Sequence, residues 1–253
     1  MLDALTQALA QGDFLNATFA GAIAVVVVAS IVKGFAGFGI AMISGPVLSA
    51  LYTPVEGVAI VLLLEIVTSL PLLPRAIRLA EWQLVTPLVV ASALTVPVGA
   101  AVLIGLDAAI MRRVIAGAAL TFAIILMSGW RFSARQSVPL SIGIGVFSGT
   151  ITGATGMGNP ILLLYAMAGA TPPERQRATI AMLSFLMVTV ATVVLLVSGA
   201  VETAAAWRAV VLVPLSLFCV FLGARLFGRT SAANFRRAIL GVIVVTSTIA
   251  LFL

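Results

Sequence analysis

Two glycine-rich stretches, one in each half of the chain, have the residue types and spacing to bind an anion. They read KGFAGFG from residue 33 and TGATGMG from residue 152. Three glycines recur at an offset of 119 residues: Gly34, Gly37 and Gly39 against Gly153, Gly156 and Gly158. Glycine lets the chain turn and lets a ligand approach the backbone. A helix restarting after each turn, near Ile40 and near Pro160, would offer free N–H groups and a positive dipole end to an anion.

Several side chains beside the two turns could contribute to the same site. Lys33, the only lysine in the chain, could attract the anion, or could instead extend its charged end to a membrane interface. Phe38 and Met157 stand between matching glycines and could gate the site or only pack in the core. Thr155 and Asn159 could bind the ligand or only satisfy broken helix backbone. The predicted substrate site comprises Lys33, Gly34, Gly37, Phe38, Gly39, Gly153, Thr155, Gly156, Met157, Gly158 and Asn159. Tight helix packing through small residues is the alternative explanation of the glycines.

A single carboxylate, Glu65, lies well inside an apolar run of the first half. An ionisable residue within the bilayer is costly and marks a functional site by default. We therefore predict that Glu65 carries protons during transport. The alternative is a glutamate that hydrogen-bonds to a neighbouring serine or threonine for packing.

Composition places the chain in the membrane class and narrows the chemistry. Of its 253 residues, 62% are hydrophobic and only 9% are charged, whereas a soluble domain is about a quarter charged. The chain has no histidine and one cysteine, Cys219, so we predict no catalytic residue, no metal site and no cofactor. The net charge of +6 comes from arginines spread between apolar runs, which is typical of membrane loops and not of nucleic-acid binding.

The apolar runs predict an all-α polytopic membrane protein with eight to ten membrane segments in a single transporter domain, residues 1–253. Further matches between the halves indicate a duplication: Thr-Pro at 53 and 171, Gly-Ala at 99 and 223, and Arg-Arg at 112 and 236. Repeat 1 would cover about 17–131 and repeat 2 about 138–253. We expect each repeat to begin with two short, glycine-interrupted segments (17–33 with 37–52, and 138–152 with 158–170) and to continue with three longer spans. Chance matching of common glycines is the alternative.

The distribution of arginines predicts that the two repeats are inverted. If each short pair returns the chain to the side from which it entered, ten arginines share one side, and Arg112, Arg113 and Arg208 lie on the other. The positive-inside rule then makes the ten-arginine side cytoplasmic and both termini periplasmic. If only the second short segment of each pair fails to cross, the bias falls to nine basic residues against five, so this arrangement is disfavoured.

The chain resembles the sulfite exporter TauE/SafE family, also called toluenesulfonate uptake permeases. The resemblance rests on KGFAGFG, on TGATGMGNP, on the Thr-Pro that follows each, and on the two-half layout, over about residues 18–253. It implies a multi-pass secondary transporter of the bacterial inner membrane that moves sulfite, sulfonates or related organic anions. It also implies seven or eight spans from a duplicated unit, and it does not select the substrate.

These observations together predict a secondary transporter of small sulfur-containing or organic anions, with export the favoured direction. Its partners would be a small anion and the lipid bilayer. Either protons or the membrane potential would drive transport, and a homo-oligomer is left open. An anion channel is the nearest alternative. An intramembrane enzyme is disfavoured because no histidine and no close pair of buried carboxylates is available, and a purely structural protein is disfavoured by the broken helices.

Overall fold

A computed structural model describes residues 16–36, 38–129, 132, 136–158, 160–168, 171–226, 241, 243–245 and 247–248. Within these ranges the regular structure is entirely helical, which confirms the expected all-α class. The elements are α2 (Ala17–Ala36), α3 (Ile40–Leu51), α4 (Pro54–Ser69), the 3-10 turn η1 (Leu70–Leu72), α5 (Leu73–Leu79), α6 (Trp82–Gly105), α7 (Ala108–Met127), α8 (Val138–Thr155), α9 (Pro160–Met167), α10 (Pro173–Val197) and α11 (Thr203–Leu226). The expected run at 235–253 lies largely outside the described residues.

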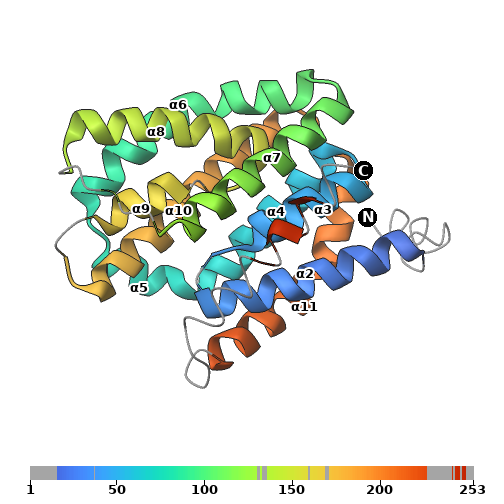
Figure 1. Ribbon diagram of the computed structural model, residues 1–253, viewed down its shortest axis with the longest axis horizontal. Helices are drawn as coiled ribbons and strands as arrows, with labels where there is room; N and C mark the ends of the chain where they lie inside the picture. Colours follow the sequence, from blue (N-terminus) through green and yellow to red (C-terminus); the bar gives the residue numbers. More distant parts are fainter. Residues whose placement is uncertain are drawn as a thin grey trace.

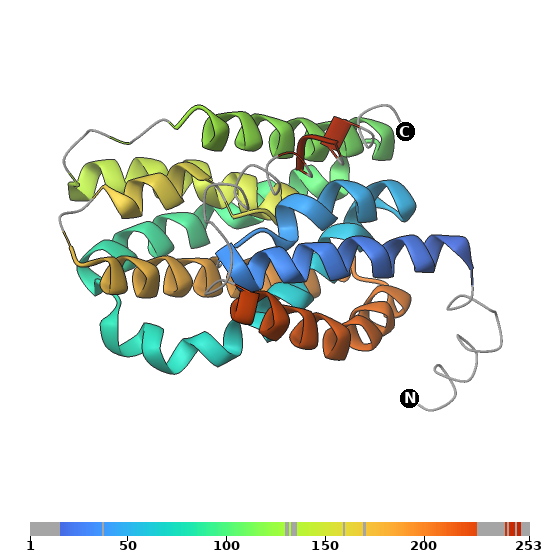
Figure 2. The ribbon, with the colours of Figure 1, turned by 60° about the horizontal axis from the view of Figure 1, so that its bottom comes forward.

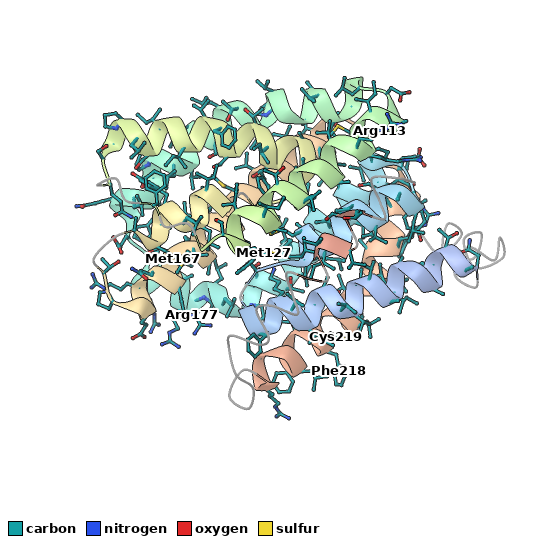
Figure 3. All side chains as sticks on the ribbon, viewed as in Figure 1. Arg113, Met127, Met167, Arg177, Phe218 and Cys219 are labelled. Carbon is teal, nitrogen blue, oxygen red and sulfur yellow. The ribbon has the colours of Figure 1, made fainter. Side chains whose placement is uncertain are left out.

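Seven helical segments of the described chain are long and apolar enough to cross a membrane, which confirms the polytopic class. They are α2, α6, α7, α8, α10 and α11, together with the continuous segment Pro54–Leu79 that contains α4 and α5. Figure 1 shows these helices running roughly along the long axis of the molecule. In Figure 3, Arg113 and Arg177 lie towards opposite ends of the bundle.

In each glycine-rich pair only the second helix is short, which differs from the expectation. Helices α2 and α8 contain 20 and 18 residues, about 30 and 27 Å at 1.5 Å per residue. Helices α3 and α9 contain 12 and 8 residues, too few to cross a core of about 30 Å. The expectation of short runs at 17–33 and 138–152 was wrong because Gly34 and Gly153 remain helical and do not end their helices.

The helical course instead breaks at Gly39 and Gly156. Each of these glycines has a positive φ and lies shortly before the next helix begins. Gly39 has φ 125° and Gly156 has φ 68°, conformations that residues with a side chain adopt only at a steric penalty. The Gly156 N–H closes the end of α8 by donating to the Thr152 carbonyl at 2.8 Å. Helices restart at Ile40 and at Pro160, as the sequence predicts.

The two glycine-broken pairs enter the molecule from opposite ends. In Figures 1 and 2, α2 and α8 begin at opposite ends of the long axis. Each of the short helices, α3 and α9, runs back towards the end where its partner begins (Figure 2). An inverted repeat would follow this course, and the inverted arrangement itself stays a prediction. The repeat limits at 17–131 and 138–253 remain predictions.

Helix α2 of the first half packs against α11 of the second half through glycine on both sides. A methyl group on Gly34 would overlap the carbonyl of Val220, and one on Gly223 would overlap the carbonyl of Ile31. The two backbones therefore approach each other more closely than any side chain allows, which is the usual role of small residues between membrane helices.

Helices α8 and α6 repeat this arrangement with the halves exchanged. A methyl group on Gly153 would overlap the carbonyl of Val96, and one on Gly99 would overlap that of Thr150. Under the offsets found in the sequence, Gly153 corresponds to Gly34 and Gly99 corresponds to Gly223. The first helix of each half thus packs against the third long helix of the other half.

Two ion pairs also join the halves, and their burial differs greatly. Arg208 of α11 contacts Glu56 of α4 at 2.5 Å, with side chains only 14% and 11% exposed. Arg75 of α5 contacts Glu174 of α10 at 2.5 Å, with side chains 73% and 57% exposed. Glu56 additionally forms a capping box with Thr53 at the start of α4.

Removing the arginine from each pair should therefore have unequal effects on stability. Arg208→Met leaves Glu56 buried without its partner and should cost about 3 kcal/mol. Arg75→Met removes a solvated pair and should cost less than about 1 kcal/mol. Thermal unfolding of the two variants in detergent would measure the difference. Equal midpoints would show that the Arg208–Glu56 pair does not stabilise the fold.

Candidate functional site

A cavity lies between the two glycine turns. Gly39 lines it from the first turn, and Gly156 and Gly158 line it from the second. The remaining lining residues come from α2, α3, α4, η1 and α10 and from the loop before α3: Lys33, Phe38, Ala41, Met42, Glu65, Ser69, Leu72, Ala181, Ser184 and Val188. About 50 Å³ is open to the centres of water-sized molecules, whereas one water needs about 10–15 Å³ in this measure. The cavity has room for a few waters or for one small oxyanion.

The start of α3 forms one wall of this cavity. The first N–H groups of a helix have no partner within the helix, and no side chain caps the start of α3 at Gly39. Ala41 and Met42, in this first turn, both line the cavity. The positive end of the α3 dipole therefore points towards a space that contains Gly156 and Gly158 of the other half.

A buried cation stands beside the helix start. Lys33, near the end of α2, is only 4% exposed. Its ammonium group forms an ion pair with the carboxylate of Glu65. It also donates to Thr68 Oγ1 at 2.8 Å and to Ser69 Oγ at 3.0 Å, and lies 3.3 Å from the Glu65 carbonyl oxygen. Lys33 is therefore held inside the protein by α4 and does not extend to an interface.

Glu65 lies near the middle of the Pro54–Leu79 segment, with its side chain 11% exposed. The sequence marked Lys33 and Glu65 separately, one for the anion and one for protons, and the structure brings them together. Serine and threonine do surround this pair, but their hydroxyls accept from Lys33 rather than bonding the Glu65 carboxylate.

The predicted site residues fall into three groups in the structure. Six of the twelve line the cavity: Lys33, Phe38, Gly39, Glu65, Gly156 and Gly158. Four do not line it: Gly34, Gly153, Thr155 and Met157. Gly37 and Asn159 lie outside the described residues.

The four residues that do not line the cavity have evident structural roles. Gly34 and Gly153 sit in the close helix contacts described above. Thr155 donates to the Ile151 carbonyl at 2.8 Å and accepts from the Met157 N–H at 3.2 Å, which shapes the turn. Met157 is fully buried in the hydrophobic core. We leave these four out of the proposed binding site.

Two polar residues of the cavity, Ser69 and Ser184, are absent from the sequence prediction. Ser69 follows Glu65 by four residues, so the helical period alone places it on the same face. The offset of 119 that relates the glycine turns takes Glu65 to Ser184. Both serines could therefore have been predicted from the sequence, by helical spacing and by the repeat offset, starting from Glu65.

The described residues offer no group of three or more His, Cys, Asp or Glu side chains that could hold a metal ion. The polar groups of the cavity are instead one ammonium, one carboxylate, serine hydroxyls and free backbone N–H groups. This set suits a small anion that accepts hydrogen bonds from a cation and from backbone.

Comparisons with known proteins agree on one group of membrane proteins. A family model described as "Sulfite exporter TauE/SafE" matches residues 22–249. A protein of Cupriavidus necator named "Probable sulfite/organosulfonate exporter TauE" is 27% identical over 220 residues, which cover 82% of this chain and 84% of that protein. No solved structure matches the chain.

Proposed function

The chain belongs to the sulfite exporter TauE/SafE family, and from this premise we propose that it is a secondary transporter of small sulfur-containing anions, sulfite or organic sulfonates. The name of its Cupriavidus necator relative supports this substrate class and supports export as the direction. The seven candidate spans make it a multi-pass membrane protein. We place it in the bacterial inner membrane, with the arginine-rich loops cytoplasmic and both termini periplasmic.

One observation carries the proposal: a buried ammonium group and a free helix start share a cavity between the two glycine turns. Non-helical backbone within a membrane protein persists only where protein buries it or where it lines a cavity. Transporters with inverted repeats bind their substrate where such broken helices of the two halves meet. The anion would sit against the first turn of α3, close to Lys33, with Gly156 and Gly158 opposite.

Both halves contribute to the cavity, which favours a carrier over a static binding site. Residues of α2, α3 and α4 line it from the first half, and Gly156, Gly158 and α10 line it from the second. Movement of one group of helices against the other would open the cavity to one side of the membrane at a time. Glu65, at the same cavity, would couple this movement to protons.

The transport assay that tests this proposal uses purified protein in liposomes, with sulfite, methanesulfonate, toluenesulfonate, sulfate and acetate as candidate substrates. We expect saturable uptake of sulfite or a sulfonate, with exchange of labelled for unlabelled anion across the membrane. Saturation and exchange distinguish a carrier from an anion channel. The absence of flux for every anion would refute the proposed function.

Filling the cavity should stop this flux. A methyl group on Gly158 would meet no atom within 4 Å, so we expect Gly158→Leu to be accommodated and to place four carbon atoms beside the cavity. We expect uptake to fall at least tenfold while the thermal unfolding temperature stays close to that of the original protein. The matched control is Gly143→Leu, because Gly143 also has open space around it but lies on the exposed face of α8. Normal uptake by Gly158→Leu would place the transport route elsewhere.

A further inference from the structure

The hydrogen bonds of Lys33 leave no N–H group free for a substrate. An ammonium group has three N–H donors and no acceptor. Those of Lys33 face four acceptors: the Glu65 carboxylate, the Glu65 carbonyl, Thr68 Oγ1 and Ser69 Oγ. In this state the cation is fully paired, so an anion entering the cavity would gain little from it.

The two hydroxyl groups are fixed as acceptors towards Lys33. Thr68 Oγ1 donates its single hydrogen to the Leu64 carbonyl at 2.6 Å, and Ser69 Oγ donates its own to the Glu65 carbonyl at 2.6 Å. Both hydrogens are therefore used within α4, and only oxygen lone pairs point at the ammonium group. Thr68 and Ser69 can therefore keep their contacts with the Lys33 ammonium group whatever the charge on Glu65.

Glu65 is thus the one partner of Lys33 whose charge a proton can remove. Lys33 and Glu65 are the only titratable side chains among the described residues that line the cavity. Helices α3 and α6 and the turn η1 carry no charged residue. The charged side chains of the other neighbouring helices lie near the ends of helical segments and do not line the cavity: Glu56, Arg75, Arg78, Arg112, Arg113, Glu174, Arg175, Arg177, Arg208 and Arg225.

From this arrangement we infer that Glu65 and the substrate compete for Lys33, so that each anion is bound together with one proton on Glu65. This inference rests on the proposed transport function. With Glu65 ionised, the ion pair is neutral and a nearby anion would be repelled by the carboxylate. A proton taken from water neutralises Glu65, frees one N–H of Lys33 towards the cavity, and leaves the hydroxyls holding the ammonium group.

The competition between Glu65 and the substrate for Lys33 determines which substrate charge the site prefers. The empty site contains Lys33⁺ and Glu65⁻ and has no net charge. With one proton and one monoanion bound, the site is again neutral, whereas a dianion leaves it with one uncompensated negative charge. Net charge within a membrane protein is expensive. The site should therefore prefer monoanions, such as bisulfite or a sulfonate, to dianions such as sulfate, and should move a monoanion with its proton without moving charge.

Methanesulfonate and sulfate are suitable probes, since the first stays a monoanion and the second a dianion over the pH range in which the protein is stable. In liposomes containing the original protein, a pH gradient of one unit should drive about tenfold accumulation of methanesulfonate on the alkaline side, because one pH unit is a factor of ten in proton activity. A membrane potential, set with potassium and valinomycin, should leave this accumulation unchanged. Sulfate uptake should be at least tenfold slower.

The variant Glu65→Gln separates the proton from the anion. Glutamine resembles the protonated carboxyl group, so methanesulfonate should still cross the membrane but without accumulating in response to a pH gradient. Accumulation should instead follow the membrane potential, about tenfold for each 60 mV, as expected for one uncompensated charge.

The control is Glu56→Gln. The Glu56 side chain is as buried as that of Glu65, at 11% exposed, and it is paired with Arg208 away from the cavity. Glutamine also preserves the capping box at this position, and pH-driven accumulation should persist.

If Glu65→Gln does not fold, the original protein still decides the matter. A pH-sensitive dye inside the liposomes should record one proton for each methanesulfonate taken up. Potential-driven uptake without proton movement, pH-driven accumulation that survives in Glu65→Gln, or sulfate uptake as fast as that of methanesulfonate would each overturn the inference. In each case anion flux is present, so the proposed transport function stands. Only a complete lack of flux in the wider substrate screen would refute that function.

Discussion

Substitution of Lys33 by methionine should reduce anion uptake about 100-fold. Lys33 is the only cation among the described residues that line the cavity, so the substitution removes the charge-assisted hydrogen bond to the substrate. Such bonds contribute about 1.5–3 kcal/mol, and 2.7 kcal/mol corresponds to about 100-fold in affinity. Initial rates of sulfite and methanesulfonate uptake in liposomes, measured at equal amounts of reconstituted protein, would test this expectation.

Loss of transport in Lys33→Met must be distinguished from loss of the fold. Methionine leaves Glu65 buried without its partner, which should lower stability by several kcal/mol. The double variant Lys33→Met/Glu65→Gln removes both charges and should recover the unfolding temperature, but not the uptake. Normal uptake by the double variant would show that Lys33 does not contact the anion. Lys33→Arg is a weaker test because guanidinium and ammonium groups differ in shape as well as in hydrogen-bond number.

Replacing Gly34 or Gly153 by leucine should abolish production of folded protein. Each glycine faces the backbone carbonyl of a neighbouring helix, Val220 or Val96, with no space for a methyl group. The neighbouring backbone cannot rotate away as a side chain can, so the helices must separate along their whole contact. The penalty should exceed the 1–3 kcal/mol typical of an overpacked core. The fraction of monodisperse protein on size-exclusion chromatography after detergent extraction would measure it.

Gly117→Leu is the matched control for these two variants. Gly117 lies within α7, and a methyl group there would meet nothing within 4 Å. It should be produced at normal levels, because leucine is a better helix former than glycine. If Gly34→Leu or Gly153→Leu folded normally but lost transport, those glycines would belong to the substrate site after all, as the sequence alone suggested.

The sequence was most informative where backbone geometry leaves few choices. Helix restarts at Ile40 and Pro160 could be placed because a left-handed turn between apolar helices nearly requires glycine, and Gly39 and Gly156 provide it. The same reasoning was wrong for Gly34 and Gly153, which are also glycines but lie inside helices and pack against the backbone of a neighbouring helix. Whether a glycine ends a helix or packs against another depends on the neighbouring backbone, and that neighbour is nearly 190 residues away for Gly34.

The pairing of charges was beyond the reach of the sequence for a similar reason. Lys33 and Glu65 each stand out as an ionisable residue in an apolar run, so both could be assigned to the site. Their contact depends on the rotation of α2 about its axis against α4, which hydrophobic periodicity does not determine when helices are apolar on all sides. The pair Arg208 and Glu56, separated by 152 residues, shows the same limit. Glu56 could be recognised only as a residue favoured at a helix start.

The exchange of first helices between the halves has a consequence for biogenesis. Helix α2 leaves the ribosome early, yet α11, against which its glycine face packs, is translated almost 170 residues after α2 is complete. The charge on Lys33 is neutralised much sooner, once α4 delivers Glu65 to the membrane. In a nascent chain that stops before residue 203, the charge of α2 is therefore neutralised, but α2 lacks its packing partner α11. The backbone around Gly34 would then be exposed to lipid. Such truncated chains should be recognised and degraded, so that insertion is completed only when the last helices are added.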